Sequence, residues 1–226
     1  MPAAAALSAP PSPLLSTHAL ACRRGERLLF AGLDLQLEPG QVVWLRGSNG
    51  RGKTSLLRIL AGLAHAEAGE VCREGQPIKA VREAHAQGAA YVAHANALKE
   101  DLTALEALGF LARLHGQQAD EAALLAALNR LGIASRRDAP VRTLSQGQRR
   151  RVALSRLALA PHKPLWLLDE PYDALDTDGC AKVDALIAEH ARAGGSVVLT
   201  SHLPLALTDP RPIELMLHSD NKKIAA

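Results

Sequence analysis

Apolar and polar positions change their spacing along the chain, and the first third has the pattern of strands around one helix. Residues 28–37 alternate in part between apolar and polar side chains, which predicts an outer, half-exposed strand. Residues 41–46 form a short β-prone run that leads into a glycine-rich segment. Beyond that segment a helix is expected, with Gly62 as its C-terminal stop, because apolar side chains recur at helical spacing at Leu56, Leu57, Ile59, Leu60 and Leu63. The pattern predicts a strand, a glycine-rich loop and a helix.

The middle of the chain, from about residue 97 to residue 159, has a helical pattern instead. Thr103 and Glu106 form a capping box that opens a helix. This helix is predicted to place four leucines on one face: Leu105, Leu108, Leu111 and Leu114. Asp120 opens a second helix, rich in alanine and leucine, which is expected to end near Gly132.

Ser145 and Gln148 form another capping box, so a third helix is predicted to begin there. Strands then return at residues 165–168 and, after a pair of glycines, at residues 197–200. Strands, then helices, then strands indicate an α/β core with an inserted helical subdomain.

The division of the chain follows from this order. We expect a disordered tail rich in alanine and proline over residues 1–13, and a single domain over residues 14–226. The core is predicted to occupy about 14–94 and 160–226, and the helical subdomain about 95–159.

Composition narrows the class of function. Hydrophobic residues make up 48% of the 226 residues, enough for a sizeable core. A net charge of +3 and an aromatic content of 3% give no support to nucleic acid as a partner. The three scattered cysteines lack metal or disulfide spacing, and no apolar run reaches the roughly 18–20 residues that span a bilayer. We therefore expect a cytosolic protein without a signal peptide or a membrane span.

The glycine-rich segment matches the phosphate-loop pattern G-x-x-x-x-G-K-[ST] between a predicted strand and a predicted helix. A ligand-free glycine turn is the alternative, and the flanking elements disfavour it. Backbone N–H groups and the helix N-terminus would face phosphate oxygens. Lys53 would neutralise the β- and γ-phosphates, and the Thr54 hydroxyl would bind Mg²⁺. The candidate ATP-binding residues here are Gly47, Ser48, Asn49, Gly50, Arg51, Gly52, Lys53, Thr54 and Ser55.

Two carboxylates follow the apolar run at residues 165–168, which has the composition of a strand buried on both faces. Asp169 is placed to hold Mg²⁺, and Glu170 to orient or deprotonate a water. Alone, such a pair is more often a solvated strand end. Downstream of a phosphate loop, it predicts nucleotide hydrolysis.

The segment Leu144, Ser145, Gln146, Gly147 and Gln148, between the phosphate loop and the carboxylates, resembles the signature of the ATP-binding cassette (ABC) ATPases. We call these five residues the signature segment. As a lone match it would be a helix cap and nothing more. In this order, the motifs are similar to that family over nearly the whole chain from about residue 14.

The resemblance implies a P-loop NTPase core of the RecA-like type, an antiparallel β subdomain and an inserted α-helical subdomain that carries the signature. It implies ATP and Mg²⁺ as cofactors. It also implies a second copy of the chain, whose ATP the signature segment contacts. Asp176 resembles the family's D-loop aspartate at the dimer interface, and His202 resembles the switch histidine that contacts the γ-phosphate.

Three positions depart from the family pattern, the mildest being Gln146, which replaces a common glycine of the signature. The usual adenine-stacking aromatic is missing near Arg24, whose guanidinium plane is the substitute that we expect. His94 stands where a Mg²⁺-binding glutamine is usual, so it is a further candidate ligand.

The segments GSNGRGKTSLLRILAGL, LSQGQRRRVALSRL, LLDEPYDALD and LTSHLPL resemble the branch of the family that supports haem export for cytochrome c maturation. That resemblance implies haem exporter permeases as membrane partners and a peripheral location at the cytoplasmic face of the bacterial inner membrane. An ATPase for a different small molecule or lipid exporter is the alternative. A soluble ATPase acting on ribosomes or DNA is disfavoured by the single cassette and by the absence of heptads and zinc spacing.

Overall fold

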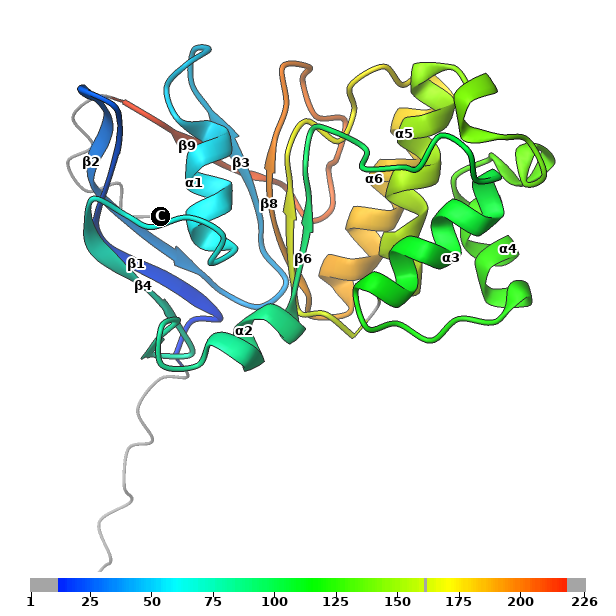
Figure 1. Cartoon of the computed structure of the whole chain (residues 1–226). Helices are drawn as coiled ribbons and strands as arrows, with labels where there is room; N and C mark the ends of the chain where they lie inside the picture. Colours follow the sequence, from blue (N-terminus) through cyan, green and yellow to red (C-terminus); the bar gives the residue numbers. More distant parts are fainter. Residues whose placement is uncertain (1–11, 161, 219–226) are drawn as a thin grey trace, which may run out of the picture.

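The computed structural model describes residues 12–160 and 162–218. The predicted tail over residues 1–13 lies outside the described residues except for its last two positions. Two β-sheets and a group of helices stand side by side, and α1 lies between the sheets (Figure 1). The antiparallel sheet has the order β2-β1-β4-β5, and the parallel sheet has the order β6-β7-β8-β3-β9.

Nine strands of the described residues form the two sheets. The antiparallel sheet contains β1 (Leu15–Arg24), β2 (Arg27–Leu37), β4 (Ala68–Arg73) and β5 (Gln76–Pro77). The parallel sheet contains β3 (Val42–Arg46), β6 (Ala89–Val92), β7 (Leu165–Leu168), β8 (Ser196–Thr200) and β9 (Ile213–Met216). The strands predicted at residues 28–37, 41–46, 165–168 and 197–200 are all confirmed. β7 is buried along its whole length, as its apolar composition predicts.

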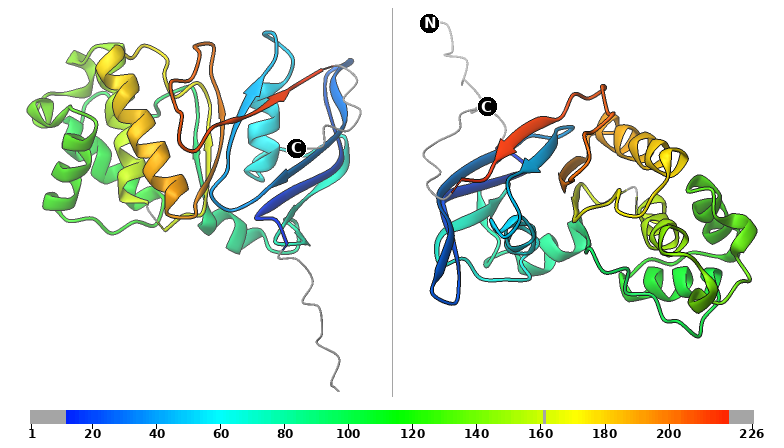
Figure 2. Two further views of the ribbon diagram at one scale, coloured as in Figure 1. Left: turned by 180° about the vertical axis from the view of Figure 1, so that it is seen from behind. Right: turned by 90° about the horizontal axis from the view of Figure 1, so that it is seen from above.

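Helices cover the parallel sheet and fill the other end of the molecule. They are α1 (Lys53–Leu60), α2 (Arg82–Gly88), α3 (Ala104–Leu114), α4 (Glu121–Arg130), α5 (Gln146–Ser155) and α6 (Thr177–Arg192), with short 3-10 turns η1 (Ala134–Arg136), η2 (Val141–Thr143) and η3 (Arg156–Leu159). Figure 2 shows α3, α4 and α5 gathered beyond α6, on the far side of the parallel sheet from β1 and β2. The capping boxes at Thr103 and Ser145 and the cap at Asp120 are present as predicted.

Three hydrophobic clusters hold these layers together. The first joins α1 to the antiparallel sheet and to one face of the parallel sheet. The second packs α6 on the opposite face, and the third lies among α3, α4 and α5. Because the parallel sheet is covered on both faces, its strand ends form a fixed edge on which a site can be built.

The predicted leucine face of α3 is wrong. Leu108 and Leu111 are buried, at 0% and 4% exposed, but Leu114 is 67% exposed. Each three-residue step falls about 60° short of a full turn, so after three steps Leu114 points away from Leu105. Small residues complete the buried stripe instead: Ala104, Ala107 and Ala112.

Candidate active site

The phosphate loop connects the end of β3 to the first residue of α1. Gly52, at the N-cap of α1, has a φ of 93°, and a Cβ there would lie 3.0 Å from the Cβ of Leu29. Only glycine fits this conformation and this close approach. The Lys53 ammonium donates a hydrogen bond of 2.7 Å to the carbonyl oxygen of Gly47. This contact folds the lysine back across its own loop, where a bound phosphate would meet it.

A pocket of about 620 Å³ opens over this loop, and we call it the nucleotide pocket. It is lined by loop and α1 residues, by the β1–β2 hairpin and by residues that follow three parallel strands: Arg24, Arg27, Leu29, Asn49, Gly50, Arg51, Gly52, Lys53, Thr54, Ser55, His94, Asp169, Glu170 and His202. The structure thus brings together most of the residues predicted to bind ATP or Mg²⁺. Gly47 and Ser48 belong to the same loop but not to the pocket lining.

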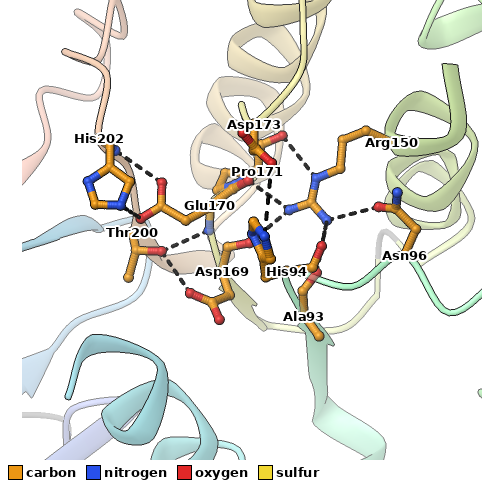
Figure 3. A network of polar contacts seen from close by, with 10 residues as sticks. All are labelled: Ala93, His94, Asn96, Arg150, Asp169, Glu170, Pro171, Asp173, Thr200 and His202. Carbon is orange, nitrogen blue, oxygen red and sulfur yellow. Dashed lines mark hydrogen bonds and ion pairs between the residues drawn. The ribbon is translucent and has the colours of Figure 1, made fainter. Parts of the chain in front are cut away.

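The hydroxyl of Thr200, at the end of β8, bonds the side chain of Asp169 and the main chain of Glu170, the two acids that follow β7. The Thr200 Oγ1 donates to Oδ1 of Asp169 at 3.0 Å and accepts the backbone N–H of Glu170 at 2.8 Å. Asp169 is only 3% exposed. A neutral partner fixes this carboxylate without cancelling its charge, so it remains available to a cation (Figure 3).

Glu170 has a left-handed backbone, with a φ of 49°, which is uncommon for a residue other than glycine. Its Oε2 accepts the backbone N–H of His202 at 3.0 Å, and its Oε1 lies 3.4 Å from Nε2 of His202. The Glu170 side chain is 15% exposed and the His202 side chain 59%. A half-enclosed carboxylate beside an accessible imidazole is an arrangement that can hold a water and take a proton from it.

His94 lies just beyond β6 and points into the nucleotide pocket. Its Nε2 is 4.0 Å from Oδ2 of Asp173, and its side chain is 61% exposed. An imidazole nitrogen is a poor ligand for Mg²⁺, which prefers oxygen. The position therefore fits contact with a water or with the nucleotide better than direct metal ligation.

The oxygen donors of Thr54 and Asp169 match the ligand preference of Mg²⁺. Within the described residues, no group of three or more His, Cys, Asp or Glu side chains could hold a metal ion. A divalent ion in this pocket would therefore need phosphate oxygens to complete its shell, as is usual for nucleotide-bound Mg²⁺.

The signature segment lies at the start of α5, where Ser145 is the N-cap. The Gln148 N–H donates to Oγ of Ser145 at 3.2 Å, and the Ser145 N–H donates to Oε1 of Gln148 at 3.0 Å. A Cβ at Gly147 would overlap the carbonyl oxygen of Ala174, so the loop before Asp176 crosses this helix end in close contact.

A second pocket, of about 730 Å³, opens beside this helix end, and we call it the signature pocket. Ser145, Gln146, Gly147 and Gln148 line it together with Asp176, which is the N-cap of α6 and forms an ion pair with Arg151. Leu144 is buried in the helical core instead. The two pockets have no residue in common.

Sequence reasoning missed several residues of the site. Arg27 and Leu29 line the nucleotide pocket. Thr200 bonds the Asp169 carboxylate and the Glu170 backbone N–H, and Arg150 is buried next to the main chain of both acids. The signal for Thr200 was its position as a polar residue at the end of an apolar strand, two residues before His202. Three consecutive arginines at residues 149–151 gave no indication of which one is buried.

Comparison with known proteins agrees with this geometry. The family model described as ABC transporter matches residues 30–173. The chain belongs to the ABC transporter ATPases. As a member of this family it binds ATP and hydrolyses it as the ATPase subunit of a transporter.

This ABC ATPase is also similar to individual curated relatives and to solved structures. It is 49% identical over 191 residues to the cytochrome c biogenesis ATP-binding export protein CcmA of Aromatoleum aromaticum, covering 84% of this chain and 89% of the relative. It is 44% identical over 198 residues to the Escherichia coli K12 protein of the same name, covering 88% of this chain and 93% of that one. An ABC transporter ATP-binding protein from Pyrococcus furiosus has the same fold, with a TM-score of 0.75 and 25% identity over 90% of this chain and 97% of that chain.

In the part of this ABC ATPase that the structure describes, no helix has both the length and the apolar character needed to cross a membrane.

Proposed function

We propose that this ABC ATPase hydrolyses ATP to support haem export for cytochrome c biogenesis, in a complex with membrane permeases. The observation that carries the ATPase chemistry is the meeting of the phosphate loop with Asp169, Glu170 and His202 in one pocket. The names and the high identity of the relatives support the haem branch.

At the phosphate end, the loop amides and the N-terminus of α1 hold the phosphate oxygens. Lys53 leaves the Gly47 carbonyl for the β- and γ-phosphates. Thr54 and Asp169 would hold Mg²⁺, which would supply charge neutralisation at the phosphates when bound. The remaining loop residues, from Ser48 to Ser55, shape this cradle.

Hydrolysis then needs a water in line with the γ-phosphate. Glu170 accepts a proton from this water while the water oxygen attacks the γ-phosphorus. The bond between the γ-phosphorus and the oxygen that leaves with ADP then breaks. His202, held against the Glu170 carboxylate, contacts the γ-phosphate and fixes the carboxylate's direction. His94 contacts the same region, through water, from the end of β6.

Two copies of the chain form the complete enzyme. The signature pocket shares no residue with the nucleotide pocket of the same chain, which supports a role for it at the ATP of a second copy. The helix end at residues 144–148 presents N–H groups to the γ-phosphate held by the other copy, and Asp176 lies beside it at the interface.

At the base end, Arg24 lies flat against the purine in place of an aromatic ring. Its neighbours Arg27 and Leu29 complete this wall of the pocket. Contact through a guanidinium plane gives little basis for distinguishing adenine from guanine.

The permeases bind on the surface formed by residues 95–111, which runs from the end of β6 into α3. The complex holds this chain at the cytoplasmic face of the inner membrane. An exporter of a different small molecule or lipid remains the second candidate, because nothing in the nucleotide pocket depends on the cargo.

The test is to replace the native gene by a Glu170→Gln variant in cells and to stain their membrane proteins for covalently bound haem after a denaturing gel. We expect the c-type cytochrome bands to disappear and to return with the native gene. Unchanged bands, with the variant present at native levels, would contradict the haem branch and favour the other exporter.

A further inference from the structure

Arg150 is a charged residue in the core, on α5 and two residues after the signature segment. Its exposed fraction is 2%, and it is among the largest fully buried side chains of the described residues. Gln146 and Arg150 are one helical turn apart, so a shift at the signature end of α5 moves this side chain as well.

The guanidinium group reaches two loops of the nucleotide pocket at once (Figure 3). Its Nη1 donates to the carbonyl oxygens of Ala93 and His94, at 2.8 and 3.3 Å, and to Oδ1 of Asn96 at 3.2 Å. These three acceptors belong to the loop after β6.

The other nitrogens reach the loop after β7. Nη2 donates to the carbonyl oxygens of Asp169 and Glu170, both at 2.8 Å, and Nε donates to that of Pro171 at 3.4 Å. All six acceptors lie in the two segments that carry His94, Asp169 and Glu170. The planar fork of the guanidinium is what allows one side chain to serve both loops.

The buried charge is balanced by these carbonyl dipoles and by nearby acids. Burial lowers the pKa of Arg150, and the carboxylates of Asp173, Asp169 and Glu170 act in the opposite direction. A buried cation is tolerated only when its donors are satisfied, so the fixed carbonyls and the guanidinium hold each other in place.

Glu170 has the greatest need of such support, because its left-handed backbone persists only when its neighbours constrain it. The N–H of Glu170 is bonded to Thr200, and its C=O accepts from Arg150. Both polar groups of this residue's main chain are therefore anchored, one to β8 and the other to α5.

We propose that Arg150 is a positioning residue for ATP hydrolysis, which sets the Glu170 and His94 loops and couples them to the signature helix of the same chain. When the second copy's ATP binds the signature segment, α5 transmits that contact through Arg150 to this copy's own Glu170. The inference rests on the proposed function, since it assigns Arg150 to the loops that hold the proposed water-activating group.

The test compares Arg150→Gln and Arg150→Lys with Arg156→Gln in the purified full chain. Arg156 is a suitable control because its partly buried guanidinium also donates to a main-chain carbonyl, that of Tyr91 in β6, and has no hydrogen bond to either loop of the nucleotide pocket. Turnover is measured against ATP concentration to give kcat, KM and the Hill coefficient, and thermal unfolding is followed in parallel.

We expect Arg150→Gln to lower kcat about 100-fold, the cost typical of a displaced reacting group, with KM changed by no more than about twofold. The Hill coefficient should fall to about 1, since the link between the two sites is lost. Arg150→Lys should lose about tenfold in kcat, because one ammonium cannot span both loops. Arg156→Gln should lower the unfolding temperature and leave kcat within about threefold of native.

A kcat loss in Arg150→Gln no larger than that in Arg156→Gln, or a KM that rises as kcat falls, would overturn the inference. If Arg150→Gln does not fold, a native kcat and Hill coefficient in Arg150→Lys overturn it equally. Glu170→Gln is run beside them. If Glu170→Gln turns over normally, the proposed role of Glu170 in activating the water is wrong, whereas an inactive Glu170→Gln with an active Arg150→Gln removes only the role of Arg150.

Discussion

The nucleotide pocket and the signature pocket are similar in volume, at about 620 and 730 Å³, but they are built in opposite ways. The first gathers groups that can react: a buried carboxylate, a left-handed Glu170 and a lysine folded over its loop. The second offers a capped helix end with a glycine in tight contact with the next loop. We therefore expect the first pocket to carry out the chemistry and the second to recognise an anion presented to it.

The largest expected effect comes from Glu170→Gln in the nucleotide pocket. The amide oxygen can still accept the backbone N–H of His202, which now meets Glu170 Oε2 at 3.0 Å, but it cannot take a proton from water. We expect turnover to fall about 10²–10⁴-fold while ATP binding is kept, so the ATP-bound dimer accumulates. Steady-state turnover with light scattering measures both, and normal turnover would show that another residue activates the water.

Lys53→Ala should have the next largest effect, and it acts on binding. The ammonium that now caps the Gly47 carbonyl at 2.7 Å would be absent when phosphate enters. Loss of its charge-assisted bonds to phosphate should weaken ATP binding about 100-fold or more. Equilibrium binding of a fluorescent ATP analogue to the isolated chain measures this, with the exposed Lys79→Ala as control. Equal affinity in the two variants would refute the phosphate-loop assignment.

Gly147→Ala tests the role of the signature pocket, because Gly147 lines that pocket and not the nucleotide pocket. The added methyl group must displace the Ala174 carbonyl, at a cost of about 1–3 kcal/mol typical of overpacking. We expect ATP affinity of the isolated chain to be unchanged and ATP-driven pairing in a Glu170→Gln background to be weakened.

A matched control for this change is Gly109→Ala in α3. There the new methyl group meets the flexible end of Leu124 at 3.2 Å, far from either pocket. Pairing lost equally in both variants, by sedimentation with and without ATP, would mean that the signature pocket has no special part in it.

How much of this arrangement the sequence predicts depends on how local each feature is. The phosphate loop, β7 with its two carboxylates and the caps at Thr103 and Ser145 are read from neighbouring residues, and all are found at the predicted positions. Such features depend on backbone geometry over a few residues, which residue type controls directly.

Features that depend on distant partners were not predictable. β1, β4 and β9 have weak patterns of their own and are fixed by pairing with strands elsewhere in the chain. Thr200 and Arg150 acquire their roles only when the ends of β6, β7 and β8 are brought together. The prediction of a leucine face on α3 is wrong because leucines three residues apart drift around a helix whose repeat is 3.6 residues.

The smallest expected effect concerns the base end of the nucleotide pocket. If Arg24 stacks on the purine, Arg24→Ala should weaken binding of ATP and GTP alike by about threefold, the scale of an exposed cation–π contact. Competition binding with both nucleotides tests this, with Arg23→Ala as control, since Arg23 pairs with Glu67 outside the pocket. A change in ATP binding alone would show that this wall recognises adenine specifically.

The most direct test determines whether the signature segment of one copy contacts the ATP bound to the other copy. A tagged Lys53→Ala chain, whose own ATP binding is expected to be severely weakened, is mixed with an untagged Glu170→Gln chain. The mixture contains an ATP analogue that carries a photoreactive group on its γ-phosphate, at a concentration that only the Glu170→Gln chain binds. We predict that light labels residues 144–148 of the tagged chain in the mixture and not when that chain is alone. Absence of this label in a mixture shown by light scattering to contain mixed dimers would contradict a site shared between two copies.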